Sequence, residues 1–151
     1  MIPFRTLIVC LAVTCICAAL APAAGAEPAR RYVGTQPDDK RPFSPGVVVG
    51  NTLYLAGTLG VDAKTGQPPA DIKTEIKNAL DSLQKTAEAA GYKMDDLVSV
   101  QVFCTDLTLF DTFNEVYRTY FHGHFPARAF LGTDKLLRNA HFEIMGIAVK
   151  G

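Results

Sequence analysis

Apolar residues recur with a helical period in two stretches of the chain. In the first stretch they form one stripe: Ile72, Ile76, Ala79, Leu80, Leu83, Ala87 and Ala90. This spacing predicts an amphipathic helix over residues 72–90, which Asp71 can cap and Gly91 can end in a left-handed conformation. In the second stretch the stripe consists of Leu109, Phe113, Val116, Tyr117 and Tyr120. It predicts a helix over residues 109–121, with Thr108 and Asp111 as a capping box at its start.

Shorter apolar runs predict β-strands before, between and after these helices. The runs Val47–Val49 and Leu53–Ala56 flank Gly50-Asn51, a pair that suits the two-residue turn of a hairpin. Further strands are expected at residues 97–104, 128–131 and 142–149. The order β-β-α-β-α-β-β predicts an α+β fold, with two helices on one face of a mixed sheet of four or more strands.

Both faces of this predicted sheet carry apolar residues. Val47-Val48-Val49 and the run from Ile144 to Val149 are apolar at successive positions, so they present apolar side chains on both sides. Two helices can cover only one side, and soluble monomers avoid large exposed apolar patches. We therefore expect an oligomer whose sheets face one another around an axis.

The segment before the hairpin is polar. Residues 27–42 contain three prolines, at positions 28, 37 and 42, which predicts an extended or flexible lead-in. The folded domain is expected to begin at Phe43 and to span residues 43–151. Without the first 26 residues the chain keeps about 125 residues, enough for one domain with its own core.

The N-terminus has the three parts of a secretory signal peptide. Arg5 supplies a positive charge, Leu7–Leu20 is an uncharged apolar stretch, and Ala24-Gly25-Ala26 supplies small residues. We expect residues 1–26 to be removed after Ala26, the mature protein to be secreted or periplasmic, and no membrane association after cleavage. A retained N-terminal anchor is the alternative, although the apolar stretch is short for a membrane span.

Cleavage would also change the cysteine content. Cys10, Cys15 and Cys17 lie in the removed segment, and Cys104 would remain alone, so no intrachain disulfide is expected. The chain has 15 basic and 15 acidic residues and a formal net charge of zero. Because no basic cluster is present, we expect no nucleic-acid partner.

Arg128 and Glu143 are the main candidates for chemistry. Arg128 follows a proline and opens a predicted strand, whereas Glu143 lies in the apolar run 142–149. A buried carboxylate is costly unless it is paired or used, and a guanidinium can bind a carboxylate through two parallel hydrogen bonds. The pair therefore indicates either a small-molecule site or a structural ion pair at a strand end.

Four other residues are weaker candidates. Cys104 could be a nucleophile, but a strand cysteine is more often a small core residue. His122 and His124 form an H-x-H pair without further obvious ligands, so we expect no metal site and favour a role at a helix end or in a loop. His141 lies on the same side of its strand as Glu143 and could either tune this carboxylate or end the strand in solvent.

Several motifs together resemble the Rid family, also called the YjgF family, over residues 43–149. The motifs that carry the resemblance are Val49-Gly50-Asn51, Leu55-Ala56-Gly57, Asp95–Val98, Val102–Leu107, Phe113–Tyr117, Phe121, Phe125–Arg128, Glu143-Ile144 and Gly146–Val149. No single motif is specific, but their order and spacing are. The resemblance implies a chorismate-mutase-like fold and a homotrimer with a barrel-like core and three clefts between subunits.

The resemblance also implies an activity, namely hydrolysis of 2-imino acids and their enamine tautomers to 2-keto acids and ammonia. Arg128 matches the family arginine that binds the substrate carboxylate, Glu143 the glutamate near the attacking water, and Asn114 an asparagine of the same cleft. Phe43, Ala56 and Phe130 are expected among the substrate contacts. No metal and no organic cofactor is expected, and the expected partner is an imino acid or another small carboxylate.

The chain departs from the family pattern at four cleft positions. Phe43 replaces a tyrosine, Ala56 and Ala129 replace serines, and Thr58 replaces a glutamine. A more apolar cleft favours either a bulkier substrate side chain or a weak or absent activity. The alternative function is therefore a noncatalytic exported trimer that binds small carboxylates or acts as a stress-related binding protein.

Overall fold

The computed structural model describes residues 28–35 and 38–151. The predicted signal peptide, residues 1–26, lies outside this range, and its cleavage and export remain predictions. Within the described residues, no helix has the length and apolar character needed to cross a membrane.

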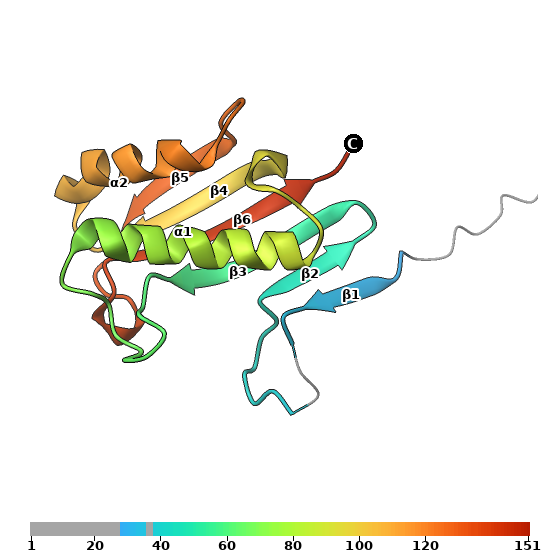
Figure 1. Cartoon of the computed structure of the whole chain (residues 1–151), viewed down its shortest axis with the longest axis horizontal. Helices are drawn as coiled ribbons and strands as arrows, with labels where there is room; N and C mark the ends of the chain where they lie inside the picture. Colours follow the sequence, from blue (N-terminus) through green and yellow to red (C-terminus); the bar gives the residue numbers. More distant parts are fainter. Residues whose placement is uncertain (1–27, 36–37) are drawn as a thin grey trace, which may run out of the picture.

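A six-stranded mixed sheet forms one layer of the molecule (Figure 1). Its strands are β1 (Arg30–Val33), β2 (Gly46–Val49), β3 (Thr52–Leu59), β4 (Leu97–Cys104), β5 (Ala127–Gly132) and β6 (Phe142–Val149). Their spatial order is β1-β2-β3-β6-β4-β5, and β4 and β5 are the one parallel pair among them. The predicted hairpin is confirmed, since β2 pairs with β3 across Gly50-Asn51 and Gly50 has a φ of +59°.

The helices were also predicted from the apolar stripes. Helix α1 (Ile72–Ala89) and helix α2 (Phe110–Tyr117) pack side by side on one face of the sheet, which confirms the α+β arrangement (Figure 1). The Asp71 carboxylate accepts a hydrogen bond from the Thr74 N–H at 2.8 Å, and Gly91 has a φ of +86°. Both predicted ends of the first helix are therefore confirmed.

Two details of the prediction were wrong. The capping box at Thr108 is absent, because the Asp106 carboxylate accepts from the Thr108 N–H at 2.9 Å and opens the 3₁₀ helix η2 (Leu107–Leu109) instead. The helical stretch is also not uniform, since a second 3₁₀ helix, η3 (Arg118–Tyr120), follows α2. Two further 3₁₀ turns are η1 (Met94–Asp96) and η4 (Leu137–Asn139).

The predicted lead-in, extended or flexible over residues 27–42, contains an ordered strand at Arg30–Val33. Strand β1 pairs with β2 along its whole length, so the fold begins well before Phe43. Val33 is buried, and the Arg31 guanidinium donates to the Ala90 carbonyl at 2.8 Å, which ties β1 to the end of α1. Of the prolines that suggested flexibility, Pro28 and Pro42 lie outside the strand, and Pro37 lies outside the described residues.

The two faces of the sheet differ in what covers them. Residues such as Val100, Val102 and Ile144 point toward the helices and are fully buried. The opposite face carries Tyr54, Met145 and other partly exposed apolar side chains, and no helix of the described chain packs on it. The uncovered face that the sequence predicted is therefore present in the single chain.

Candidate functional site

Arg128 lies among aromatic rings on the helix-covered face of β5. Its guanidinium carbon is 4.7 Å from the ring centroid of Tyr117, and three further rings lie at 5.7–5.9 Å, those of Phe110, Phe113 and Phe130. The half-buried position of the guanidinium lowers its pKa below the usual value, but an arginine stays charged at any physiological pH. Within the described residues Arg128 has no carboxylate partner, so its hydrogen-bond donors are available to a ligand.

A cavity of about 360 Å³ opens beside this guanidinium. Its lining residues are Phe110, Asn114, Tyr117, Arg118, Phe125 and Arg128. Asn114 comes from α2 and is 7% exposed. Arg128, Asn114 and Phe130 were all predicted as site residues, and the fold brings these three to one place.

Tyr117 belongs to the same cavity, although its helical spacing indicated a core residue. Its ring is 3% exposed, and burial raises the pKa of its hydroxyl to about 12. Among the described residues this hydroxyl is the one buried side-chain polar atom without a hydrogen-bond partner. The stripe that predicted burial was correct, but it could not show that the ring also supports Arg128.

Glu143 lies on the opposite, uncovered face of the sheet. In the strand register it is flanked by Leu59 of β3 and Phe103 of β4, whereas Arg128 is level with Val100 on the helix side. The Glu143 carboxylate packs against Gly57, where any Cβ would overlap it. No ion pair or hydrogen bond of this carboxylate is found within the described part of the chain, so the structural ion pair with Arg128 does not exist within one chain.

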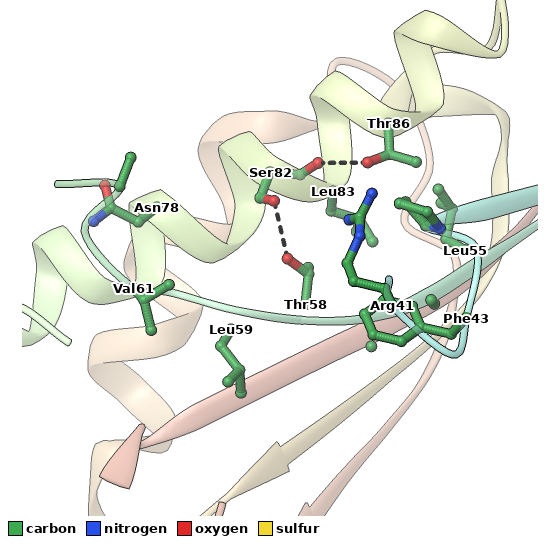
Figure 2. A pocket seen from close by; sticks show the side chains of 14 residues that line it. Arg41, Phe43, Leu55, Thr58, Leu59, Val61, Asn78, Ser82, Leu83 and Thr86 are labelled. Atoms are coloured by element: carbon green, nitrogen blue, oxygen red, sulfur yellow. Dashed lines mark hydrogen bonds between the residues drawn. The ribbon is translucent and has the colours of Figure 1, made fainter. Parts of the chain in front are cut away.

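A second cavity, of about 430 Å³, lies between α1 and the C-terminal end of β3, residues 55–59 (Figure 2). Strand β2 begins at Gly46, opposite Leu55, so residues 56–59 of β3 have no strand on their outer side. Phe43 and Ala56, both predicted substrate contacts, line this cavity together with Gly57. The predicted site residues thus lie in three places: Arg128, Asn114 and Phe130 beside α2, Phe43 and Ala56 in the cavity beside α1, and Glu143 on the uncovered face.

The sequence did not single out a buried carboxylate on α1, that of Glu75, which binds the backbone just before Glu143. Glu75 of α1 is fully buried and accepts from the backbone N–H groups of His141 at 2.6 Å and Phe142 at 3.2 Å. The His141 ring nitrogen Nδ1 lies 2.7 Å from its second oxygen. His141 therefore pairs with Glu75 and not with Glu143, and its partly exposed ring lies directly before the start of β6.

The weaker candidates have ordinary environments. Cys104 is fully buried, and burial raises the pKa of its thiol, which disfavours the reactive thiolate. The backbone N–H of His122 donates to the Asp95 carboxylate at 3.0 Å. No cluster of three or more His, Cys, Asp or Glu side chains within residues 28–35 and 38–151 could hold a metal ion.

Comparison with known proteins identifies the family. The model of the family described as Endoribonuclease L-PSP matches residues 33–150, so the chain belongs to this family, the Rid/YjgF family. A mouse protein named 2-iminobutanoate/2-iminopropanoate deaminase is 40% identical over 111 residues, which cover 73% of this chain and 82% of the mouse protein. The Escherichia coli K12 protein of the same name is 38% identical over 112 residues, covering 72% and 88% of the two chains.

Solved structures agree with this assignment. The YjgF gene product of E. coli is 34% identical and superposes with a TM-score of 0.73, covering 80% of this chain and 99% of its own. E. coli TdcF with bound serine is 30% identical, with the same TM-score and the same coverage. The chain therefore has the YjgF-type fold.

Proposed function

We propose that this protein hydrolyses 2-imino acids to 2-keto acids and ammonia, in a site that Arg128 and Glu143 form together. The observation that carries the proposal is the arginine. A charged, half-buried guanidinium without a carboxylate partner lines an aromatic cavity, and this is an arrangement suited to a small carboxylate ligand. The names of the deaminase relatives indicate which carboxylate to test first.

The chemistry requires only binding, orientation and proton transfer. Arg128 holds the substrate carboxylate through two parallel hydrogen bonds, and this contact fixes the position of the imine carbon. With the imine nitrogen protonated, Glu143 accepts a proton from a water molecule as its oxygen attacks that carbon, which gives a neutral carbinolamine. The carboxyl group then donates this proton to the amino nitrogen. The C–N bond breaks, ammonia leaves, and the hydroxyl group gives its proton to the carboxylate as the keto group forms, without any change in oxidation state.

Because the two residues lie on opposite faces of one sheet, we propose that each site uses Arg128 of one subunit and Glu143 of another. The uncovered face supports this arrangement, since exposed apolar residues there need a partner. A homotrimer with the uncovered faces turned inward would cover these side chains and create three equivalent sites. The cavity beside Gly57 would then form the other wall of each site.

The test is an imine hydrolysis assay on matched variants. An amino-acid oxidase generates the imino acid, and its loss is followed with and without the protein. Arg128→Ala removes a charge-assisted contact worth about 1.5–3 kcal/mol and also misplaces the substrate, so we expect at least about a hundredfold loss of kcat/KM. Arg128→Lys should rescue poorly, because a point charge does not reproduce the planar fork.

Glu143→Gln keeps the shape of the side chain but removes its basicity, so it should lower kcat more than it raises KM. Arg30→Ala, an exposed change in β1 away from both cavities, serves as the control and should keep wild-type rates. If the wild type binds small carboxylates but leaves imino acids unchanged, the noncatalytic binding protein is the correct function.

A further inference from the structure

The cavity of about 360 Å³ beside α2 contains a second cation besides Arg128. Arg118, the first residue of η3, lines this cavity and is exposed. Burial is the largest cause of the lowered pKa of the Arg128 guanidinium, and the positive charge of Arg118 lowers it further. The two guanidinium groups are therefore close enough to repel each other, and an anion bound between them would offset this repulsion.

Neither guanidinium has an acidic partner within the described residues. Lys73 pairs with the Glu115 carboxylate at 2.7 Å and is the main cause of its lowered pKa, to which Arg118 contributes least. No Asp or Glu of the described chain lines the cavity. A ligand with one carboxylate that binds Arg128 therefore leaves Arg118 to the solvent, whereas a ligand with two can pair with both.

Asn114 adds an unpaired amide to the same wall. The residue is 7% exposed, and its side-chain amide makes no hydrogen bond among the residues that the structure describes. Unlike the sealed Tyr117 hydroxyl, this amide is open to the cavity, so a ligand can satisfy it. The rings of Phe110 and Phe125 complete the wall and suit the methylene groups between two carboxylates.

We infer that the cavity beside α2 receives both ends of a dicarboxylate, so that the site prefers 2-imino acids whose side chain ends in a carboxylate. Arg128 binds the carboxylate next to the imine carbon, Arg118 binds the side-chain carboxylate, and the Asn114 amide donates to the same ligand. The inference rests on the proposed function, since it names the substrate class of that site.

The exposure of Arg118 limits the size of the preference. A pair of exposed charges contributes less than a buried pair, and salt screens it. We therefore expect the terminal carboxylate to strengthen binding at least about fivefold at low ionic strength. In about 1 M salt, where the Debye length is about 3 Å, most of this preference should disappear.

Calorimetry tests the preference with two stable keto acids of equal chain length. The chain of 2-oxoglutarate ends in a carboxylate, whereas that of 2-oxopentanoate ends in a methyl group. The wild-type protein should bind 2-oxoglutarate at least about fivefold more tightly at low ionic strength. Equal affinities, or tighter binding of 2-oxopentanoate, would overturn the inference.

A charge-removing variant tests whether Arg118 is the group responsible. Arg118→Gln, at an exposed position, should bring the two affinities to within about twofold of each other. Arg30→Gln removes the same charge from β1, at the opposite edge of the sheet from β5, and should keep the wild-type ratio. If Arg118→Gln keeps the wild-type ratio, or if Arg30→Gln lowers it equally, Arg118 does not receive the second carboxylate.

The imine assay separates failure of this inference from failure of the proposed function. Imino acids are supplied at matched rates from glutamate and from norvaline, which has the same chain length, and kcat/KM should favour the glutamate-derived substrate at least about fivefold. If both are consumed with equal kcat/KM, the second-carboxylate assignment is wrong and the deaminase remains. If neither is consumed, the proposed function fails and the inference fails with it.

Discussion

Replacing Tyr117 with leucine should weaken the binding of small carboxylates, although Arg128, the charged residue proposed to contact them, is unchanged. Tyr117 is the aromatic ring nearest to the Arg128 guanidinium, at 4.7 Å, while the other three rings lie a full ångström or more farther away. A cation over an aromatic ring gains about 0.5–1 kcal/mol at exposed sites and about 2 kcal/mol when desolvated. Arg128 is half-buried, so we expect about 1–2 kcal/mol, or roughly a 5- to 30-fold loss of affinity.

The measurement is the dissociation constant of pyruvate by calorimetry, together with KM and kcat in the imine assay. Tyr117→Leu should raise KM more than it lowers kcat, because the arginine is less well held before the substrate binds. Tyr117→Phe keeps the ring and should bind within about twofold of the wild type, since the hydroxyl has no partner to lose. It should also melt at a higher temperature, because a buried unsatisfied hydroxyl is removed.

Phe121→Leu is the control for lost packing. Its ring contacts that of Tyr117 with centroids 4.7 Å apart but does not contact Arg128. It should therefore lower the melting temperature without changing pyruvate affinity. The reasoning is refuted if folded Tyr117→Leu binds pyruvate like the wild type, or if Tyr117→Phe is weakened as much as Tyr117→Leu.

Three further predictions concern other parts of the molecule. Gly57→Ala should displace the Glu143 carboxylate and lower kcat at least about tenfold, whereas Gly123→Ala, with open space around it, should leave kcat unchanged. Glu75→Ala should reduce the free energy of unfolding by about 3 kcal/mol or more in urea titrations, because two buried backbone N–H groups lose their acceptor; a loss below about 1 kcal/mol would contradict this. N-terminal sequencing of the exported protein should begin at or near Glu27, and an intact N-terminus on the soluble protein would contradict cleavage.

Periodicity was sufficient to predict the main elements. The stripe from Ile72 to Ala90 predicted α1 almost to the residue, because a helix that packs on a sheet must bury one face. Strand β1 was missed because its exposed residues carry no apolar pattern, and only the pairing with β2 and the contact of Arg31 with the end of α1 order it. The sequence of residues 30–33 alone does not show that they pair with β2 or contact α1.

The sequence could name candidate site residues, but it could not predict where they lie relative to one another. Alternation shows which residues of one strand share a face, whereas the relation between Arg128 and Glu143 depends on the register of β5, β4 and β6. Glu75 was missed for a related reason. A carboxylate on a helix is normally solvated, and the N–H groups that receive it lie 66 and 67 positions further along the chain.

Mixing two inactive variants tests most directly whether the site is shared between subunits. Arg128→Ala and Glu143→Gln are each expected to be nearly inactive, and the two proteins are unfolded together at equal concentration and refolded. In randomly mixed trimers, a site that combines Arg128 of one subunit with Glu143 of its neighbour is intact about one time in four, so about a quarter of wild-type activity should return. If the co-refolded mixture is as inactive as the separate variants, while its mass shows mixed trimers, the two residues do not act together across subunits.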